Sequence, residues 1–298
     1  MHLRIATRGS KLALWQAHYT QDLLKTHGIS SELVVLKTKG DKIQHLSFDK
    51  IEGKGFFTKE IEDALLENRA DLAVHSMKDL PTSHPDGLVV TAVSQRANPA
   101  DCLVIRKEVA VMDKIMRLPN GATVGTSSAR RKAQLLHFRG DLTLKDIRGN
   151  VPTRLQKLRD GQFDAIVLAA AGLERLEMDL SEFSTLTFSP KEFVSAPAQG
   201  VLAWQTRQDD LAIRRALKAI HRPEVSSATN VERTVLKMME GGCQMPIGVY
   251  CERDPMNNYH AWAAYAAAWD APVQRAQLSQ STTAGMAEKL VEMLKKEA

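Results

Sequence analysis

The sequence predicts an α/β protein with two domains of similar construction and a smaller α+β domain at the C-terminal end. Its 298 residues, 44% hydrophobic and 25% charged, are ordinary for a globular chain of two or three domains. Strand-like and helix-like segments alternate over the first two thirds, which is typical of parallel sheets covered by helices. After about Ile220 antiparallel strand patterns take over. We therefore expect domain 1 at residues 1–97 and 196–218, domain 2 at 98–195 and domain 3 at 219–298.

Hydrophobic spacing predicts the elements of domain 1. The helix over residues 10–27 is indicated by Leu12, Trp15, Tyr19 and Leu23, which lie near helical spacing. A second helix is expected over 57–68, after a Gly- and Lys-containing loop. Strands are expected at 3–7, 32–37, 71–75, 88–94 and 201–206, the last returning to domain 1 after the break at 197–200.

The same reasoning gives the elements of domains 2 and 3. In domain 2 we expect strands at 101–106, 122–126, 142–147 and 163–168, with helices at 128–138 and 152–159. In domain 3 we expect a helix at 225–240, antiparallel strands at 247–251, 259–269 and 273–279, and a closing helix at 286–296.

The basic charge is concentrated in one stretch. The net charge is +5, and residues 125–160 alone hold nine basic and three acidic residues. This indicates either an anionic partner or a solvated helix face. Nucleic acid is disfavoured as that partner, because Phe138 is the stretch's single aromatic residue and offers no stacking platform.

The remaining composition points to a reducing compartment. No basic segment followed by an apolar stretch opens the chain, and the longest apolar run, 261–269, is too short to span a membrane. The three cysteines form neither a disulfide framework nor a metal motif. We expect a cytoplasmic monomer without a metal, a membrane or a nucleic acid as partner.

Three strand-to-helix junctions share one design, at residues 7–10, 125–131 and 148–154. Each combines a glycine, a Ser or Asn at a helix start, and arginine. Free N–H groups at a helix start favour anions, and an arginine fork matches a carboxylate. Plain helix capping is the alternative at any one junction. Together, at the C-terminal edges of parallel strands, they favour a site for several carboxylates.

Two further segments carry candidate chemistry. Asp79 follows a predicted strand beside Lys78 and before Pro81, where it could stabilise a cation or move a proton, or merely cap a turn. Cys243 lies in a loop after two glycines, whereas Cys102 and Cys251 lie in apolar strands. Cys243 is therefore the candidate nucleophile or attachment point.

These segments together resemble the porphobilinogen deaminase (hydroxymethylbilane synthase) family. Seven motifs match in order between residue 3 and about 250, among them Ala73-Val74-His75-Ser76-Met77-Lys78-Asp79-Leu80-Pro81 and Glu240-Gly241-Gly242-Cys243-Gln244-Met245-Pro246. The others lie at residues 4–17, 53–57, 125–131, 148–154 and 171–176.

The resemblance implies a fold and a reaction. It implies two α/β domains of the periplasmic-binding-protein type flanking a cleft, plus the small third domain carrying the cofactor cysteine. The implied enzyme is a transferase of tetrapyrrole (heme) biosynthesis. It condenses four porphobilinogen molecules head to tail on a covalent dipyrromethane primer, releasing ammonia and then hydroxymethylbilane.

The resemblance also implies roles for individual residues. Asp79 matches the catalytic acid, and Cys243 matches the thioether attachment of the dipyrromethane. The residues implied to bind cofactor and substrate are Arg8, Ser10, Lys54, Phe57, Lys78, Thr126, Ser127, Ser128, Arg130, Arg131, Arg148, Gly149, Arg154, Arg175 and Gln199. The chain departs from the family pattern at Glu52, Ala129 and Gln205, none of which has an implied role.

A non-catalytic binding module for small polycarboxylates is the alternative function. It would use the same cleft and the same arginine-rich helix starts, because a fold alone does not fix a function. It would need neither the loop cysteine nor the third domain.

Overall fold

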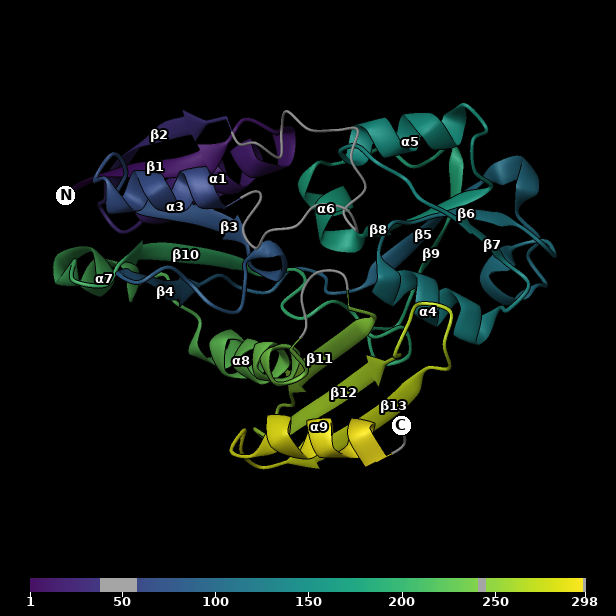
Figure 1. The fold of residues 1–298 in the computed structure, drawn as a ribbon. Helices are drawn as coiled ribbons and strands as arrows, with labels where there is room; N and C mark the ends of the chain where they lie inside the picture. Colours follow the sequence, from purple (N-terminus) through teal and green to yellow (C-terminus); the bar gives the residue numbers. More distant parts are fainter. Residues whose placement is uncertain (38–57, 241–244, 297–298) are drawn as a thin grey trace. The chain divides into compact units, whose positions relative to one another are not determined.

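A computed structural model describes residues 1–37, 58–240 and 245–296 (Figure 1). The chain divides into two compact units. Unit 1 comprises Met1–Ala97 and Gly200–Ser227, and unit 2 comprises Asn98–Gln199 and Ala228–Ala298.

Unit 1 contains a five-stranded mixed sheet with the order β2-β1-β3-β10-β4. Strand β1 runs parallel to β2 and β3, whereas β10 is antiparallel to β3 and β4. The strands are β1 (His2–Arg8), β2 (Ser30–Leu36), β3 (Leu72–Ser76), β4 (Leu88–Val93) and β10 (Leu202–Arg207). The predicted strands of this domain are therefore confirmed, with ends that differ by one or two residues.

The helices of unit 1 bury apolar side chains against this sheet. Helix α1 (Lys11–Lys25) contributes Leu24 to a core that includes Ile5 and Trp204, and all three side chains are fully buried. Helix α3 (Lys59–Leu66) packs on a second cluster through Ile61 and Leu65. The sequence analysis missed the short helix α7 (Leu211–Leu217).

The α/β part of unit 2 repeats the plan of unit 1. Its sheet has the order β7-β6-β8-β5-β9, in which β6 runs parallel to β7 and β8, and β5 is antiparallel to β8 and β9. The elements are β5 (Asp101–Arg106), β6 (Thr123–Gly125), α4 (Ala129–Phe138), β7 (Thr143–Lys145), α5 (Val151–Arg159), β8 (Ala165–Ala169), α6 (Ala170–Arg175) and β9 (Phe183–Thr187). Neither β9 nor α6 was predicted.

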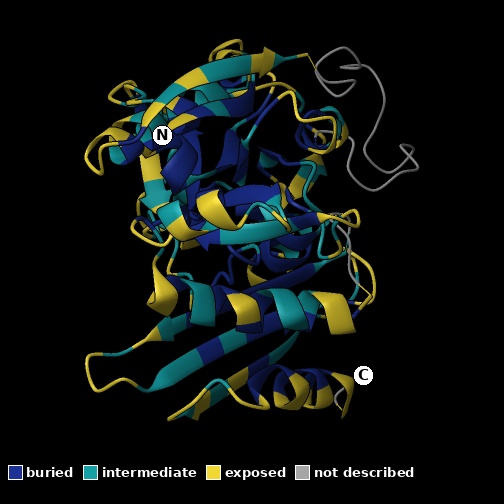
Figure 2. Ribbon diagram, turned by 90° about the vertical axis from the view of Figure 1, so that its left-hand side faces the viewer, coloured by how far each residue is buried: buried dark blue, intermediate teal, exposed yellow. Residues whose placement is uncertain are grey.

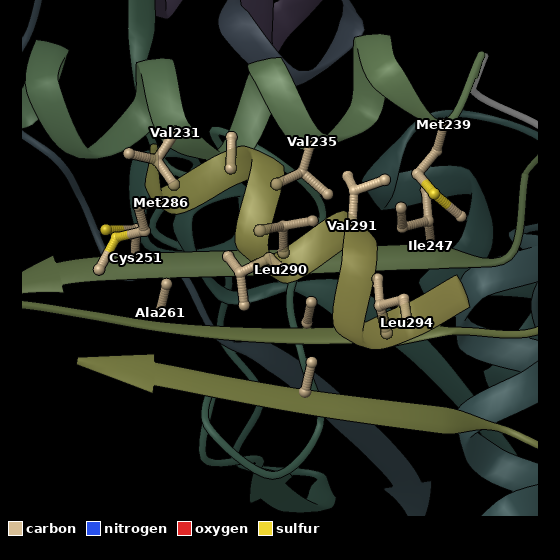
Figure 3. Close-up of a cluster of buried hydrophobic side chains, with 14 of the residues drawn as sticks. Val231, Val235, Met239, Ile247, Cys251, Ala261, Met286, Leu290, Val291 and Leu294 are labelled. Carbon is tan, nitrogen blue, oxygen red and sulfur yellow. The ribbon is translucent and has the colours of Figure 1, made fainter. Parts of the chain in front are cut away.

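The C-terminal part of unit 2 is a three-stranded antiparallel sheet with the order β11-β12-β13. Its strands are β11 (Ile247–Arg253), β12 (Tyr259–Tyr265) and β13 (Gln274–Gln280). Helix α9 (Met286–Lys296) lies beside the C-terminus with one face buried and the other exposed (Figure 2). That face and residues of α8 (Pro223–Met238) enclose a core against the sheet, with Val235 and Leu290 fully buried (Figure 3).

The predicted fold class is confirmed in its parts: two α/β sheets and a small α+β region. In one respect the expectation was too simple. Each α/β sheet contains an antiparallel strand, β10 or β5, between two neighbours. The strand pattern could not reveal this, because a strand buried on both faces has the same apolar sequence in either direction. The division into three domains stays a prediction.

Candidate functional site

A hollow of about 100 Å³ lies in unit 1 at the ends of β1 and β3. It brings together three predicted site residues, Arg8, Ser10 and Asp79. The rest of its lining is Leu12, Ala13, Gln16, Thr58, Ile61, Val74, His75 and Ser76. Both strands point their C-terminal ends toward the hollow, which is where ligands of α/β sheets bind.

The first wall of the hollow is the junction between β1 and α1. Ser10 is the N-cap of α1, and its Oγ accepts a hydrogen bond from the backbone N–H of Ala13 at 3.3 Å. Arg8 is the last residue of β1 and is half-buried. A guanidinium beside the positive end of a 15-residue helix forms an environment that stabilises a carboxylate.

The second wall is the turn that carries Asp79. Residues Met77–Asp79 form a single 3₁₀ turn after β3, and Asp79 is exposed. Leu80 is extended, with ψ at 128°, as its position before Pro81 predicts. The hydroxyl of Ser76 accepts a hydrogen bond from Gln16 Nε2 at 2.7 Å, which links the turn to α1.

A buried polar chain lies next to the hollow, and the sequence analysis missed it. His75 Nε2 lies 3.0 Å from Gln205 Oε1, and Gln205 Nε2 donates to Glu62 Oε1 at 3.0 Å. Thr58 Oγ1 donates to Glu62 Oε2 at 3.3 Å. Burial lowers the pKa of His75 to about 4 and raises the pKa of Glu62. These partners are up to 143 residues apart, so no local signal could have found them.

In unit 2, Arg130 and Arg131 are buried against Asp101. Arg130 Nη1 lies 2.8 Å from Asp101 Oδ2, and Arg131 Nη2 lies 2.7 Å from Oδ1. Gln199 Nε2 donates to the same Oδ1 at 2.9 Å. Burial alone would raise the pKa of the Asp101 carboxyl, but the two guanidinium groups outweigh it and hold that pKa well below its usual range. Both arginines thus bind a carboxylate of the protein itself.

The other two predicted junctions are built as helix starts. Ser128 Oγ accepts from the Arg131 N–H at 3.4 Å and caps α4, and Ser127 Oγ donates to the Ile147 carbonyl at 2.9 Å. Thr126 is buried, and its Oγ1 accepts from the Ser128 N–H at 3.3 Å.

The start of α5 is capped by Asn150, which accepts from the Thr153 N–H at 3.0 Å. Gly149 precedes this cap with φ at 113°, a value that favours glycine. Arg154 Nε donates to the Gly149 carbonyl at 2.7 Å. Arg148 is half-buried before this turn, and Arg175 ends α6.

Several predicted residues stand apart from these groups. Lys54, Phe57 and Cys243 lie outside the described residues. Lys78 lies in the turn with Asp79 but does not line the hollow. Over residues 1–37, 58–240 and 245–296, no group of His, Cys, Asp and Glu could hold a metal ion. In the same ranges, no helix has the length and hydropathy required to cross a bilayer.

Two family models match the chain. "Porphobilinogen deaminase, dipyromethane cofactor binding domain" matches residues 3–215, and "Porphobilinogen deaminase, C-terminal domain" matches residues 227–296. A porphobilinogen deaminase of Maridesulfovibrio salexigens is 46% identical over 84% of this chain and 80% of its own length. One of Gloeobacter violaceus is 47% identical over 84% of this chain and 76% of its own.

Solved structures give a weaker similarity. A periplasmic binding protein of Salmonella typhimurium with high arginine specificity has a TM-score of 0.42 at 12% identity, covering 78% of this chain and 97% of its own. A lipoprotein of Treponema pallidum has the same TM-score and identity, covering 81% and 97%. Similarity at this level carries no weight for fold or function.

Proposed function

The chain belongs to the porphobilinogen deaminase family, and we propose that Arg8, Ser10 and Asp79 of unit 1 belong to its active site. The protein is a transferase of tetrapyrrole biosynthesis. It condenses four porphobilinogen molecules into hydroxymethylbilane with release of ammonia, and its cofactor is dipyrromethane. The observation that carries the proposal is the hollow that the three side chains share.

The lining of the hollow fits a pyrrole that bears carboxylates. Each pyrrole of the cofactor and the growing chain carries an acetate, a propionate and a ring N–H. The Arg8 guanidinium and the N-terminus of α1 at Ser10 suit the carboxylates, and the Asp79 carboxylate suits the N–H donor. When bound, dipyrromethane supplies the free pyrrole carbon on which the chain grows.

Asp79 has two tasks in this proposal. Loss of ammonia from the protonated aminomethyl group of porphobilinogen breaks the carbon–nitrogen bond and leaves the positive charge on that substrate pyrrole. An aspartate carboxylate in hydrogen-bond reach of the ring nitrogen stabilises this charge. After the new carbon–carbon bond forms, the attacked ring loses a proton, and the same carboxylate can accept it.

We propose that the helix starts of unit 2 bind further carboxylates of the chain. Two guanidinium groups share the single Asp101 carboxylate, so the group formed by Arg130, Arg131 and Asp101 has a net positive charge, which favours binding of an anion nearby. The other residues assigned to this role are Thr126, Ser127, Ser128, Arg148, Gly149, Arg154, Arg175 and Gln199. Lys54, Phe57 and Lys78 are assigned to the same ligands from the family resemblance alone.

We assign the cofactor to Cys243 through a thioether. Cys102 and Cys251 are free cysteines, both buried within strands, and burial raises the pKa of the Cys102 thiol. Buried thiols are poor nucleophiles, which supports Cys243 as the proposed attachment point.

Mass spectrometry of the intact protein, with mapping of the Cys243 peptide, tests the assignment. We expect an excess of two pyrrole units on that peptide and an unmodified mass for Cys243→Ala. Pyrrole on Cys102 or Cys251 would contradict the choice of cysteine.

Asp79→Asn tests the role of the aspartate. This variant should retain the modified peptide yet lose nearly all porphobilinogen consumption; a near-normal rate would remove Asp79 from the mechanism.

We further propose that the enzyme is a cytoplasmic monomer. Size-exclusion chromatography with light scattering should give a mass near the 33.0 kDa of one chain.

A further inference from the structure

The hydrogen bonds beside the hollow run in one direction. The carboxylate of Glu62 accepts from Gln205 Nε2 and from Thr58 Oγ1. A carboxylate offers only acceptors, so the amide nitrogen of Gln205 must face it. The amide oxygen then faces His75, and an oxygen in that place can only accept.

The direction of these hydrogen bonds determines which ring nitrogen of His75 carries the proton. His75 is buried, and its pKa is lowered to about 4, so the ring is neutral near pH 7 and carries one proton. The hydrogen bond to Gln205 Oε1 places that proton on Nε2. Nδ1 keeps its lone pair, and no hydrogen bond reaches it from the part of the chain that the structure describes.

His75 is also a lining residue of the hollow, beside Asp79 and Arg8. Because Nε2 is engaged with Gln205, Nδ1 is the polar atom that the ring can offer to a ligand there. The charged and titratable groups near the ring are Arg8 from β1 and Asp79 from the following turn, which line the same hollow, and His84, which acts on its pKa; Glu62 of α3 lies beyond Gln205.

We propose that Glu62 and Gln205 hold His75 in its neutral, Nε2-protonated form, and that His75 Nδ1 accepts a hydrogen bond from the ring N–H of a pyrrole next to the one whose N–H faces Asp79. His75 is then a specificity residue that selects an N-unsubstituted pyrrole, while Arg8 and Ser10 select the carboxylates. The inference rests on the proposed function of the hollow, because it names the group that one more lining residue recognises.

The tautomer can be measured apart from activity. In the ¹⁵N-labelled holoenzyme, the His75 signals are identified by their loss in His75→Gln. We expect one protonated and one bare ring nitrogen between pH 6 and pH 8, with the proton on Nε2. A proton on Nδ1, or a doubly protonated ring, would overturn the inference.

Two substitutions of His75 separate a role in pyrrole recognition from a role in stabilising the fold. In His75→Gln, the amide nitrogen lies near the place of Nε2 and keeps the bond to Gln205, but the acceptor at Nδ1 is lost. We expect an unchanged unfolding midpoint and a kcat/KM for porphobilinogen about tenfold lower. His75→Asn keeps a polar atom near Nδ1 and loses the Gln205 bond, so its midpoint should fall and its kcat/KM should stay closer to wild type. The opposite ranking of the two kcat/KM values would make His75 merely structural.

Gln205→Glu tests whether the side-chain amide of Gln205 keeps His75 in its neutral form. A carboxylate beside Nε2 favours the charged imidazolium and raises the pKa of His75. Nδ1 then carries a proton at low pH, so kcat/KM should gain a new acidic limb and recover as the pH rises through the new pKa. The double variant Gln205→Glu with His75→Gln should lack this limb.

An unchanged pH profile in Gln205→Glu, with a neutral His75 in the spectrum, would contradict the inference. Failure of the proposed function looks different: wild type would bind no pyrrole and consume no porphobilinogen, whatever the tautomer. A wild-type rate in His75→Gln would overturn the further inference alone.

Discussion

Asp101 is the counter-ion of two buried arginines, Arg130 and Arg131. It is completely buried, and both of its oxygens lie within 2.8 Å of an arginine nitrogen. Arg131 also donates to the Val167 carbonyl at 3.0 Å, and Arg130 donates to the Val194 carbonyl at 2.8 Å. Removal of the carboxylate charge would leave two buried guanidinium groups without a counter-ion.

We therefore expect Asp101→Asn to lower the free energy of unfolding by about 3–5 kcal/mol, measured by urea denaturation. The matched control is the exposed pair Arg159–Glu182, 2.7 Å apart, where Glu182→Gln should cost less than about 1 kcal/mol. Equal effects of the two substitutions would refute the special role of Asp101.

The same residue makes stability depend on pH. Because the folded pKa of Asp101 lies below its unfolded value of about 4, its contribution is present above pH ~4. The contribution is lost as the pH falls through the folded pKa. Asp101→Asn should thus differ most from wild type near neutral pH, and less under strong acid.

At the scale of elements, the helix starts were predictable because their signals are local. Ser10, Ser128 and Asn150 each accept a hydrogen bond from the N–H three residues later, as expected from a Ser or Asn before an apolar-periodic run. Strand β9 and the antiparallel direction of β5 escaped prediction. Whether a segment forms a strand, and in which direction it runs, depends here on the strands that pair with it, and a local stretch of sequence does not contain that information.

The turn before α5 depends on a glycine. At Gly149 the backbone φ is 113°, and an added Cβ would lie 2.6 Å from Thr153 Cγ2, inside the capping turn. We expect Gly149→Ala to lower the free energy of unfolding by about 3 kcal/mol, through backbone strain and this clash. Gly121 also has positive φ, at 71°, but its Cβ would meet nothing within 4 Å. Gly121→Ala should therefore cost only about 1 kcal/mol; equal losses in urea denaturation would exclude the Thr153 contact.

At the scale of the whole molecule, the basic stretch 125–160 was visible in the sequence, but its pairing was not. Arg139 binds Asp141 within the stretch, whereas Arg159 binds Glu182 and the pair Arg130–Arg131 binds Asp101, both beyond it. Likewise, the resemblance suggested Arg8, Ser10 and Asp79, whereas the bond of His75 to Gln205 and the bond of Gln205 to Glu62 depend on tertiary structure. Sequence thus indicated which groups carry charge, and the fold determines which of these charges are neutralised.

The overall charge leads to a prediction about salt. The net charge is +5, and each added pyrrole brings two carboxylates, so long-range attraction should favour substrate binding. Raising KCl from about 0.1 M to about 1 M shortens the screening length from about 10 Å to about 3 Å. We expect kcat/KM for porphobilinogen to fall several-fold, mostly through KM, while kcat changes less.

The choice of anion separates screening from competition for the same groups. At equal ionic strength, potassium acetate should inhibit more than potassium chloride, because acetate is a carboxylate that can occupy the arginine and helix-start positions. Wild type and Arg154→Gln form the informative pair. Arg154 lies at the start of α5 with its Nε on the Gly149 carbonyl, so its loss should reduce the excess inhibition by acetate. Equal inhibition by both salts in both proteins would mean that the charge acts only through its long-range field, with no carboxylate bound at the helix starts.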